Sequence, residues 1–201
     1  EDLAPNQVAI AGYFCDNLDQ TFAGQRYLAR QLRYVSRSKT VPVNATDLGD
    51  LNVFPLEPEK HFSAVISQCE EVLKLGTYLV LVGGDSSGLK ALGAAVENVV
   101  NLDVPIVSIS NNNKLNLSKT QKIILSVDLK DLAGKWVSKP RRLNGLSPSQ
   151  IITQINNIPN KIIAVAIFGL APELDGRGRT ETQVALNILE AVVKRLNKGA
   201  H

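Results

Sequence analysis

Residues 77–87 have the sequence TYLVLVGGDSS, and this stretch decides the fold class. Its first six residues are nearly all apolar and mostly β-branched or aromatic, which is typical of a central strand covered on both faces. The chain then turns at Gly83-Gly84-Asp85, and an amphipathic segment follows at once. A buried strand that passes through a glycine turn into a helix predicts a layered α/β domain with a parallel sheet.

The same alternation extends in both directions from this junction. Short apolar runs are separated by segments with helical periodicity, so the sequence predicts a three-layer α/β sandwich with a mostly parallel sheet, formed as one domain over residues 1–201. The expected strands are 8–14, 41–45, 77–82, 106–109, 123–127 and 162–168.

Helix signals lie between these runs. A helix is expected from about Glu59 to Gly76, with Cys69 on its core face. Ser147-Pro148-Ser149-Gln150 has the residues of a capping box with proline in the first turn, and residues 180–183 repeat this pattern before the last helix.

Composition limits the function classes. A net charge of +3 over 201 residues is small, and the densest basic run is only 139–142, so nucleic acid is not expected as a partner. Two cysteines without framework spacing favour a reducing intracellular compartment, cytoplasm or mitochondrial matrix. No apolar stretch reaches the length of about 18 residues needed to span a bilayer, so no transmembrane segment is expected.

Candidate functional residues follow the strands, because parallel sheets bind ligands beyond the carboxyl ends of their strands. Taken in order, several of these segments resemble motifs of the ureohydrolase (arginase and agmatinase) family. The similar segments are DLGD (47–50), GGDSS (83–87), SVD (126–128), GLS (145–147), PELD (172–175) and GRT (178–180).

The resemblance implies a shortened arginase-like fold. It also implies descent from enzymes that hydrolyse guanidino compounds with two bridged manganese ions. Most of the family's metal ligands are replaced in this sequence. Ser86 occupies the position of a histidine, Lys130 occupies that of an aspartate, and Gly169 occupies that of a glutamate. Only Asp128 remains at a ligand position, so no manganese or other cofactor is expected. The degenerate former metal site comprises Asp85, Ser86, Ser110, Asn112, Lys114, Asp128 and Lys130.

Two of the substitutions introduce lysine, and an ammonium group can neutralise a carboxylate where a metal ion once did so. We therefore expect Lys130 to form a buried or half-buried pair with Asp128, and Lys114 to neutralise Asp85. The expected function is non-catalytic: a structural or regulatory subunit of a homo-oligomer or a larger complex. Two alternatives stay open: a hydrolase with altered or metal-independent chemistry at the old pocket, and a small-molecule sensor.

A rival hypothesis concerns residues 84–88, which also fit the G-x-S-x-G nucleophile elbow of serine hydrolases. The only histidine later in the chain is His201, so we favour a structural role in which Ser86 or Ser87 caps the following helix. His61, in an acidic first turn, is expected to be a surface residue rather than a metal ligand.

Three further aspartates, Asp47, Asp50 and Asp175, could in principle build a new metal site. They match turn or cap positions, so we expect them to accept backbone hydrogen bonds and fix loops. The basic run 139–142 is expected to be a solvated loop, and an exposed Trp136 beside it would suit a protein contact.

Overall fold

The computed structural model describes residues 3–16, 23–37, 45–54, 56–109, 121–137, 144–175 and 180–198. Within them, six strands form one sheet in the order β2-β1-β3-β6-β5-β4, and every neighbouring pair is parallel. This confirms the predicted α/β fold class. The strands are β1 (Val8–Gly12), β2 (Thr46–Asp50), β3 (Tyr78–Val82), β4 (Ile106–Ser108), β5 (Lys122–Asp128) and β6 (Lys161–Phe168).

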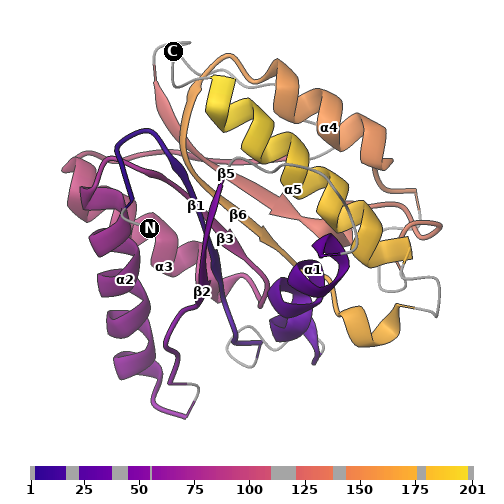
Figure 1. Ribbon diagram of the computed structural model, residues 1–201, viewed down its shortest axis with the longest axis horizontal. Helices are drawn as coiled ribbons and strands as arrows, with labels where there is room; N and C mark the ends of the chain where they lie inside the picture. The colour runs from indigo at the N-terminus through magenta and orange to yellow at the C-terminus, as the bar shows by residue number, and fades with distance from the viewer. Residues whose placement is uncertain are drawn as a thin grey trace.

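Helices cover both faces of the sheet (Figure 1). One face packs against α1, α4 and α5, and the other against α2 and α3, so each face has its own apolar core. The helices are α1 (Leu28–Ser36), α2 (Pro58–Lys74), α3 (Ser87–Val100), α4 (Pro148–Asn157) and α5 (Thr180–Lys198), with 3-10 turns η1 (Gln25–Tyr27), η2 (Leu129–Asp131) and η3 (Pro172–Leu174).

Strand β3 explains why its sequence is so apolar. All five of its residues are buried, because it lies between β1 and β6 and has helices on both faces. Cys69 of α2 is also fully buried, as expected. The capping box at the start of α4 is present, with Ser147 Oγ accepting from the Gln150 backbone N–H at 3.2 Å.

One strand of the sheet was not predicted. The structure has β2 at Thr46–Asp50, whereas the strand expected at 41–45 falls almost entirely outside the described residues, which exclude 38–44. Strand β2 is at the edge of the sheet and pairs with β1, so it can hold polar residues that a central strand would bury. Asp47 and Asp50 therefore lie within a strand and not in the loop after one.

Candidate functional site

The carboxyl ends of the three central strands meet at one end of the sheet. The Gly83 N–H donates to the Ile167 carbonyl at 2.8 Å, and the Gly169 N–H donates to the Gly84 carbonyl at 3.4 Å. Asp128 pairs in register with Phe168, one residue before Gly169. Since these segments adjoin, the turn that holds Asp85 and Ser86, the Gly169 backbone and the Asp128 side chain gather at the edge where ligands bind in parallel sheets.

Asp128 and Lys130 form the expected ion pair at this edge. Lys130 Nζ lies 3.8 Å from Asp128 Oδ2, and the side chains are 13% and 8% exposed. The other carboxylate oxygen of Asp128 accepts the Lys130 backbone N–H at 3.0 Å, which caps η2. The carboxylate is thus neutralised and positioned by a residue two places along its own chain.

Gly169 packs directly against this pair. Its φ of +89° lies in the left-handed region, and a Cβ atom there would overlap with Asp128 Oδ1 and lie 3.3 Å from Lys130 Cε. No larger residue fits at position 169 unless the ion pair moves. The absence of a side chain at Gly169 therefore leaves the space that the ion pair occupies.

Replacement of Lys130 by methionine is expected to lower the free energy of unfolding by about 1–3 kcal/mol, because it leaves a mostly buried carboxylate without its counter-charge. Urea denaturation measures the loss. Asp128→Asn in the Lys130→Met background should recover part of it, since an amide needs no counter-charge. A Lys130→Met variant as stable as the parent would show that the pair is not a stabilising interaction.

The turn after β3 belongs to a second buried network. Asp85 is fully buried, and its Oδ1 accepts the Ser87 backbone N–H at 3.0 Å and the Ser87 hydroxyl. Ser87 Oγ lies 2.6 Å from the Tyr13 hydroxyl, which lies 2.7 Å from Nε2 of His61. A hydrogen-bonded chain thus runs from α2 through Tyr13, just after β1, to the turn at the carboxyl end of β3.

The proton positions in this chain follow from one backbone contact. The Phe54 N–H donates to Nδ1 of His61 at 3.2 Å, so Nδ1 carries no proton. A neutral His61 must then carry its proton on Nε2 and donate to Tyr13, which donates to Ser87, which donates to Asp85. Burial lowers the pKa of His61, while the nearby charge of Asp85 opposes that shift, so the neutral form is favoured.

This network corrects two predictions. His61 was expected on the surface, yet it is fully buried, because Tyr13 and the Phe54 backbone satisfy both of its ring nitrogens. Ser86 precedes α3 but makes no side-chain cap, and Ser87 binds Asp85 instead. Both ring nitrogens of His61 are engaged, by the Tyr13 hydroxyl and the Phe54 N–H, so His61 is not placed as the base for the serine of the elbow motif.

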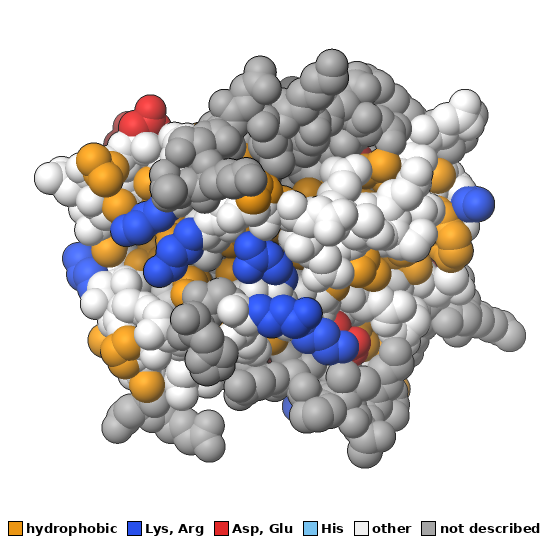
Figure 2. Space-filling view, turned by 90° about the horizontal axis from the view of Figure 1, so that it is seen from above, with side chains coloured by type: hydrophobic (Ala, Val, Ile, Leu, Met, Phe, Trp, Pro, Cys, Tyr) orange, Lys and Arg blue, Asp and Glu red, His pale blue; other side chains and the backbone are white. Residues whose placement is uncertain are grey.

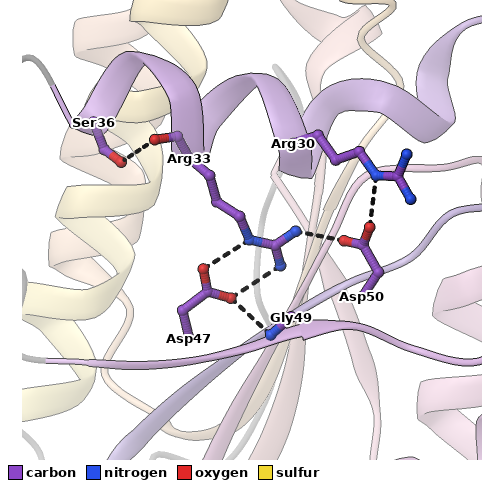
Figure 3. Close-up of polar contacts among 6 residues, drawn as sticks. All are labelled: Arg30, Arg33, Ser36, Asp47, Gly49 and Asp50. Carbon is purple, nitrogen blue, oxygen red and sulfur yellow. Dashed lines mark hydrogen bonds and ion pairs between the residues drawn. The ribbon is translucent and has the colours of Figure 1, made fainter.

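The aspartates of β2 are held by arginines of α1 (Figure 3). Arg33 donates through Nε and Nη2 to the two carboxylate oxygens of Asp47 at 2.7 and 2.9 Å, and through Nη1 to Asp50 at 2.5 Å. Arg30 Nε donates to the second oxygen of Asp50 at 2.8 Å. Burial acts to raise the pKa of Asp50, but these arginine contacts outweigh it and hold the pKa below its usual value.

These contacts partly revise the role expected of Asp47 and Asp50. Asp47 Oδ1 does accept the Gly49 N–H at 3.0 Å, as a turn residue would, but the main partners of both carboxylates are guanidinium groups. Asp175 behaves as expected: its oxygens accept the Glu181 and Thr182 N–H groups at 3.2 and 2.8 Å at the start of α5.

The remaining predictions have mixed outcomes. Trp136, which would suit a protein contact if exposed, is half-buried and packs against the core shared with α4 and α5. Ser110, Asn112, Lys114 and the basic run 139–142 lie outside the described residues, so their predicted roles stay predictions. His61 was missed as a core residue because its partner Tyr13 is 48 positions away.

In the described ranges, no group of three or more histidine, cysteine, aspartate or glutamate side chains could hold a metal ion. The one ligand-type aspartate at the end of β5 already faces an ammonium group, which would repel a cation at that point. The same ranges contain no helix that is long and apolar enough to cross a membrane.

No family model and no curated protein sequence matches this chain. Several solved structures, however, match it in fold. A proclavaminate amidino hydrolase from Streptomyces clavuligerus superposes with a TM-score of 0.81 at 13% identity, covering 99% of this chain and 94% of that one. A hypothetical agmatinase from Burkholderia thailandensis gives 0.81 at 14% identity, with 98% and 88% covered. An arginase from Medicago truncatula gives 0.78 at 11% identity, with 94% and 87% covered. The chain therefore has the ureohydrolase fold.

Proposed function

We propose that this protein is a non-catalytic ureohydrolase-like subunit, which has kept the fold and lost the metal chemistry. The observation that carries the proposal is the ion pair at the carboxyl end of β5, where Lys130 Nζ lies 3.8 Å from Asp128 Oδ2. An ammonium group in this position supplies the positive charge that a carboxylate ligand would otherwise receive from a metal ion.

Two neighbouring features support the same proposal. The Gly169 backbone packs against the pair so closely that the glutamate of the family pattern would displace it. The Asp85 carboxylate faces inward, is fully buried and is bonded to Ser87. The side chains that a catalytic ureohydrolase would direct at metal and substrate thus bind one another here, which suits a structural or regulatory role in a homo-oligomer or a larger assembly.

We expect the protein, expressed and purified with added manganese, to contain far less than one manganese ion per chain and to release no urea from arginine, agmatine or guanidine. Elemental analysis and a colorimetric urea assay measure the two quantities, and a manganese-dependent agmatinase prepared in parallel is the positive control. Stoichiometric manganese together with turnover would overturn the proposal. Turnover without manganese would instead support a hydrolase with altered chemistry.

The subunit role has its own test. Light scattering after size-exclusion chromatography should give a mass above that of one 21.8 kDa chain, or the native protein should co-purify with a defined partner at fixed stoichiometry. A strictly monomeric native protein without a stoichiometric partner would contradict it.

A further inference from the structure

The opposite end of the sheet, where the strands begin, contains a separate pocket. A half-open cavity of about 180 Å³ lies between the starts of β5 and β6 and the ends of α2 and α3. Its walls are mainly apolar and include Leu73, Val96, Val99 and Ile163. Lys122 and Lys161 also line the cavity. Because it lies at the amino ends of the strands, this pocket is distinct from the ligand position of the fold.

The two lysines are aligned by the sheet itself. Lys122 and Lys161 are the first residues of β5 and β6, and they are partners in the parallel register. The next residue of each strand, Ile123 and Ile162, belongs to the core on the side of α1, α4 and α5, so strand alternation directs both lysines to the opposite face, toward α2 and α3. Both side chains therefore reach the same apolar pocket.

Among the described residues, no neighbouring acid balances their charges. Both lysines are exposed, and in the described parts of the chain neither lies within 4.0 Å of a carboxylate oxygen. Like charges at directly opposed strand positions destabilise a sheet. A bound anion would remove that repulsion.

Two backbone carbonyls beside the pocket accept hydrogen bonds from other parts of the chain. The Val72 carbonyl accepts the Thr77 hydroxyl at 2.7 Å, and the Gly76 carbonyl accepts the Asn6 N–H at 2.9 Å. These carbonyls at the end of α2 are thus not left as free negative dipoles that would repel an anion. Figure 2 views the molecule from the end where the strands begin and shows many lysine and arginine side chains on that face, with few acidic ones.

We propose that this pocket binds a small organic anion with an apolar tail. The carboxylate or phosphate group would lie between Lys122 and Lys161, and a tail of about six carbon atoms would occupy the cavity, since a protein cavity of about 150 Å³ holds a molecule the size of benzene. The paired ammonium groups bind the anionic group of the ligand, and the apolar walls favour a ligand with an apolar tail over an inorganic ion.

Calorimetric titration with hexanoate, hexyl phosphate, acetate and hexanol tests both halves of the proposal. Hexanoate and hexyl phosphate are expected to bind at least about tenfold more tightly than acetate, which lacks the tail, and than hexanol, which lacks the charge. The double variant Lys122→Gln, Lys161→Gln should weaken hexanoate binding about tenfold. Lys90→Gln, which changes an exposed lysine near the other end of α3, should leave it unchanged.

A second variant fills the cavity and leaves the charges in place. Val99→Phe is expected to weaken hexanoate binding while the thermal midpoint confirms that the protein is folded. The proposal is overturned if hexanol binds as well as hexanoate or if the double lysine variant binds hexanoate normally. It is also overturned if the protein binds vesicles of phosphatidic acid but none of the small anions. The outcome is independent of whether the carboxyl end of the sheet is catalytic.

Discussion

Replacement of Gly84 by alanine is expected to lower the free energy of unfolding by about 2–5 kcal/mol. The φ of Gly84 is +68°, in the left-handed region, and an added Cβ atom would overlap with the Tyr13 ring and the Cys15 carbonyl oxygen. The Cys15 carbonyl belongs to the backbone, so it cannot move away unless the chain around it moves as well. The Gly84 N–H and carbonyl also bond Gln25 and Gly169, so the turn cannot shift without breaking those contacts.

Gly93 provides the matched control for this variant. It lies within α3, and an added Cβ would make an ordinary contact of 3.6 Å with Ile106 Cδ1. Gly93→Ala should therefore stabilise the protein by about 0.5–1 kcal/mol, through helix propensity. Urea denaturation followed by circular dichroism measures both variants. The steric interpretation of the turn fails if the two alanine variants have the same stability.

Replacement of His61 by phenylalanine is expected to cost about 2–4 kcal/mol of unfolding free energy. Phenylalanine keeps an aromatic ring but removes the acceptor for the Phe54 N–H and the donor for the Tyr13 hydroxyl. Both partners lie away from bulk water, because Tyr13 is fully buried and Phe54 is half-buried. Polar groups left unpaired in such places are destabilising, whereas the lost ring nitrogens themselves contribute little packing.

Tyr13→Phe separates the network from the ring packing. It removes the hydroxyl that links His61 to Ser87 and keeps the edge-to-face contact between the Tyr13 and His61 rings, whose centroids are 5.6 Å apart. In a double-mutant cycle, the sum of the unfolding free energies lost in the two single variants should exceed the loss in the double variant. Both single variants remove the same hydrogen bond, so its loss is counted twice in the sum. Strict additivity would show that His61 and Tyr13 are not coupled.

The same histidine predicts how stability depends on pH. An unfolded chain protonates histidine near pH 6.5, and burial lowers the pKa of His61 in the folded state. Below about pH 6.5 the unfolded state thus binds more protons at this residue, so stability should fall as the pH decreases through that value and on toward the folded pKa. The His61→Phe variant should lack this contribution when denaturation midpoints are compared between pH 7.5 and pH 5.5.

Several features were determined by the sequence itself because the interacting groups are close along the chain. Lys130 stands two residues after Asp128, Ser147 three residues before Gln150, and the apolar run 78–82 identifies its own strand. Asp175 likewise lies only six and seven residues before the N–H groups that it accepts from. Short-range spacing fixes which of these groups can meet, so the α/β alternation and the Asp128–Lys130 pair could be predicted from residue order.

The tertiary structure alone decided which surfaces meet. His61 is buried because α2 brings it against Tyr13 of the segment after β1, and Asp50 is a strand residue because β2 pairs with β1, where Asp50 is the partner of Gly12. Trp136 is half-buried because the core shared with α4 and α5 extends to it. Burial depends on contacts between segments tens of residues apart, and local periodicity does not contain that information. A histidine in an acidic helix start therefore predicts a surface residue until its distant partner is known.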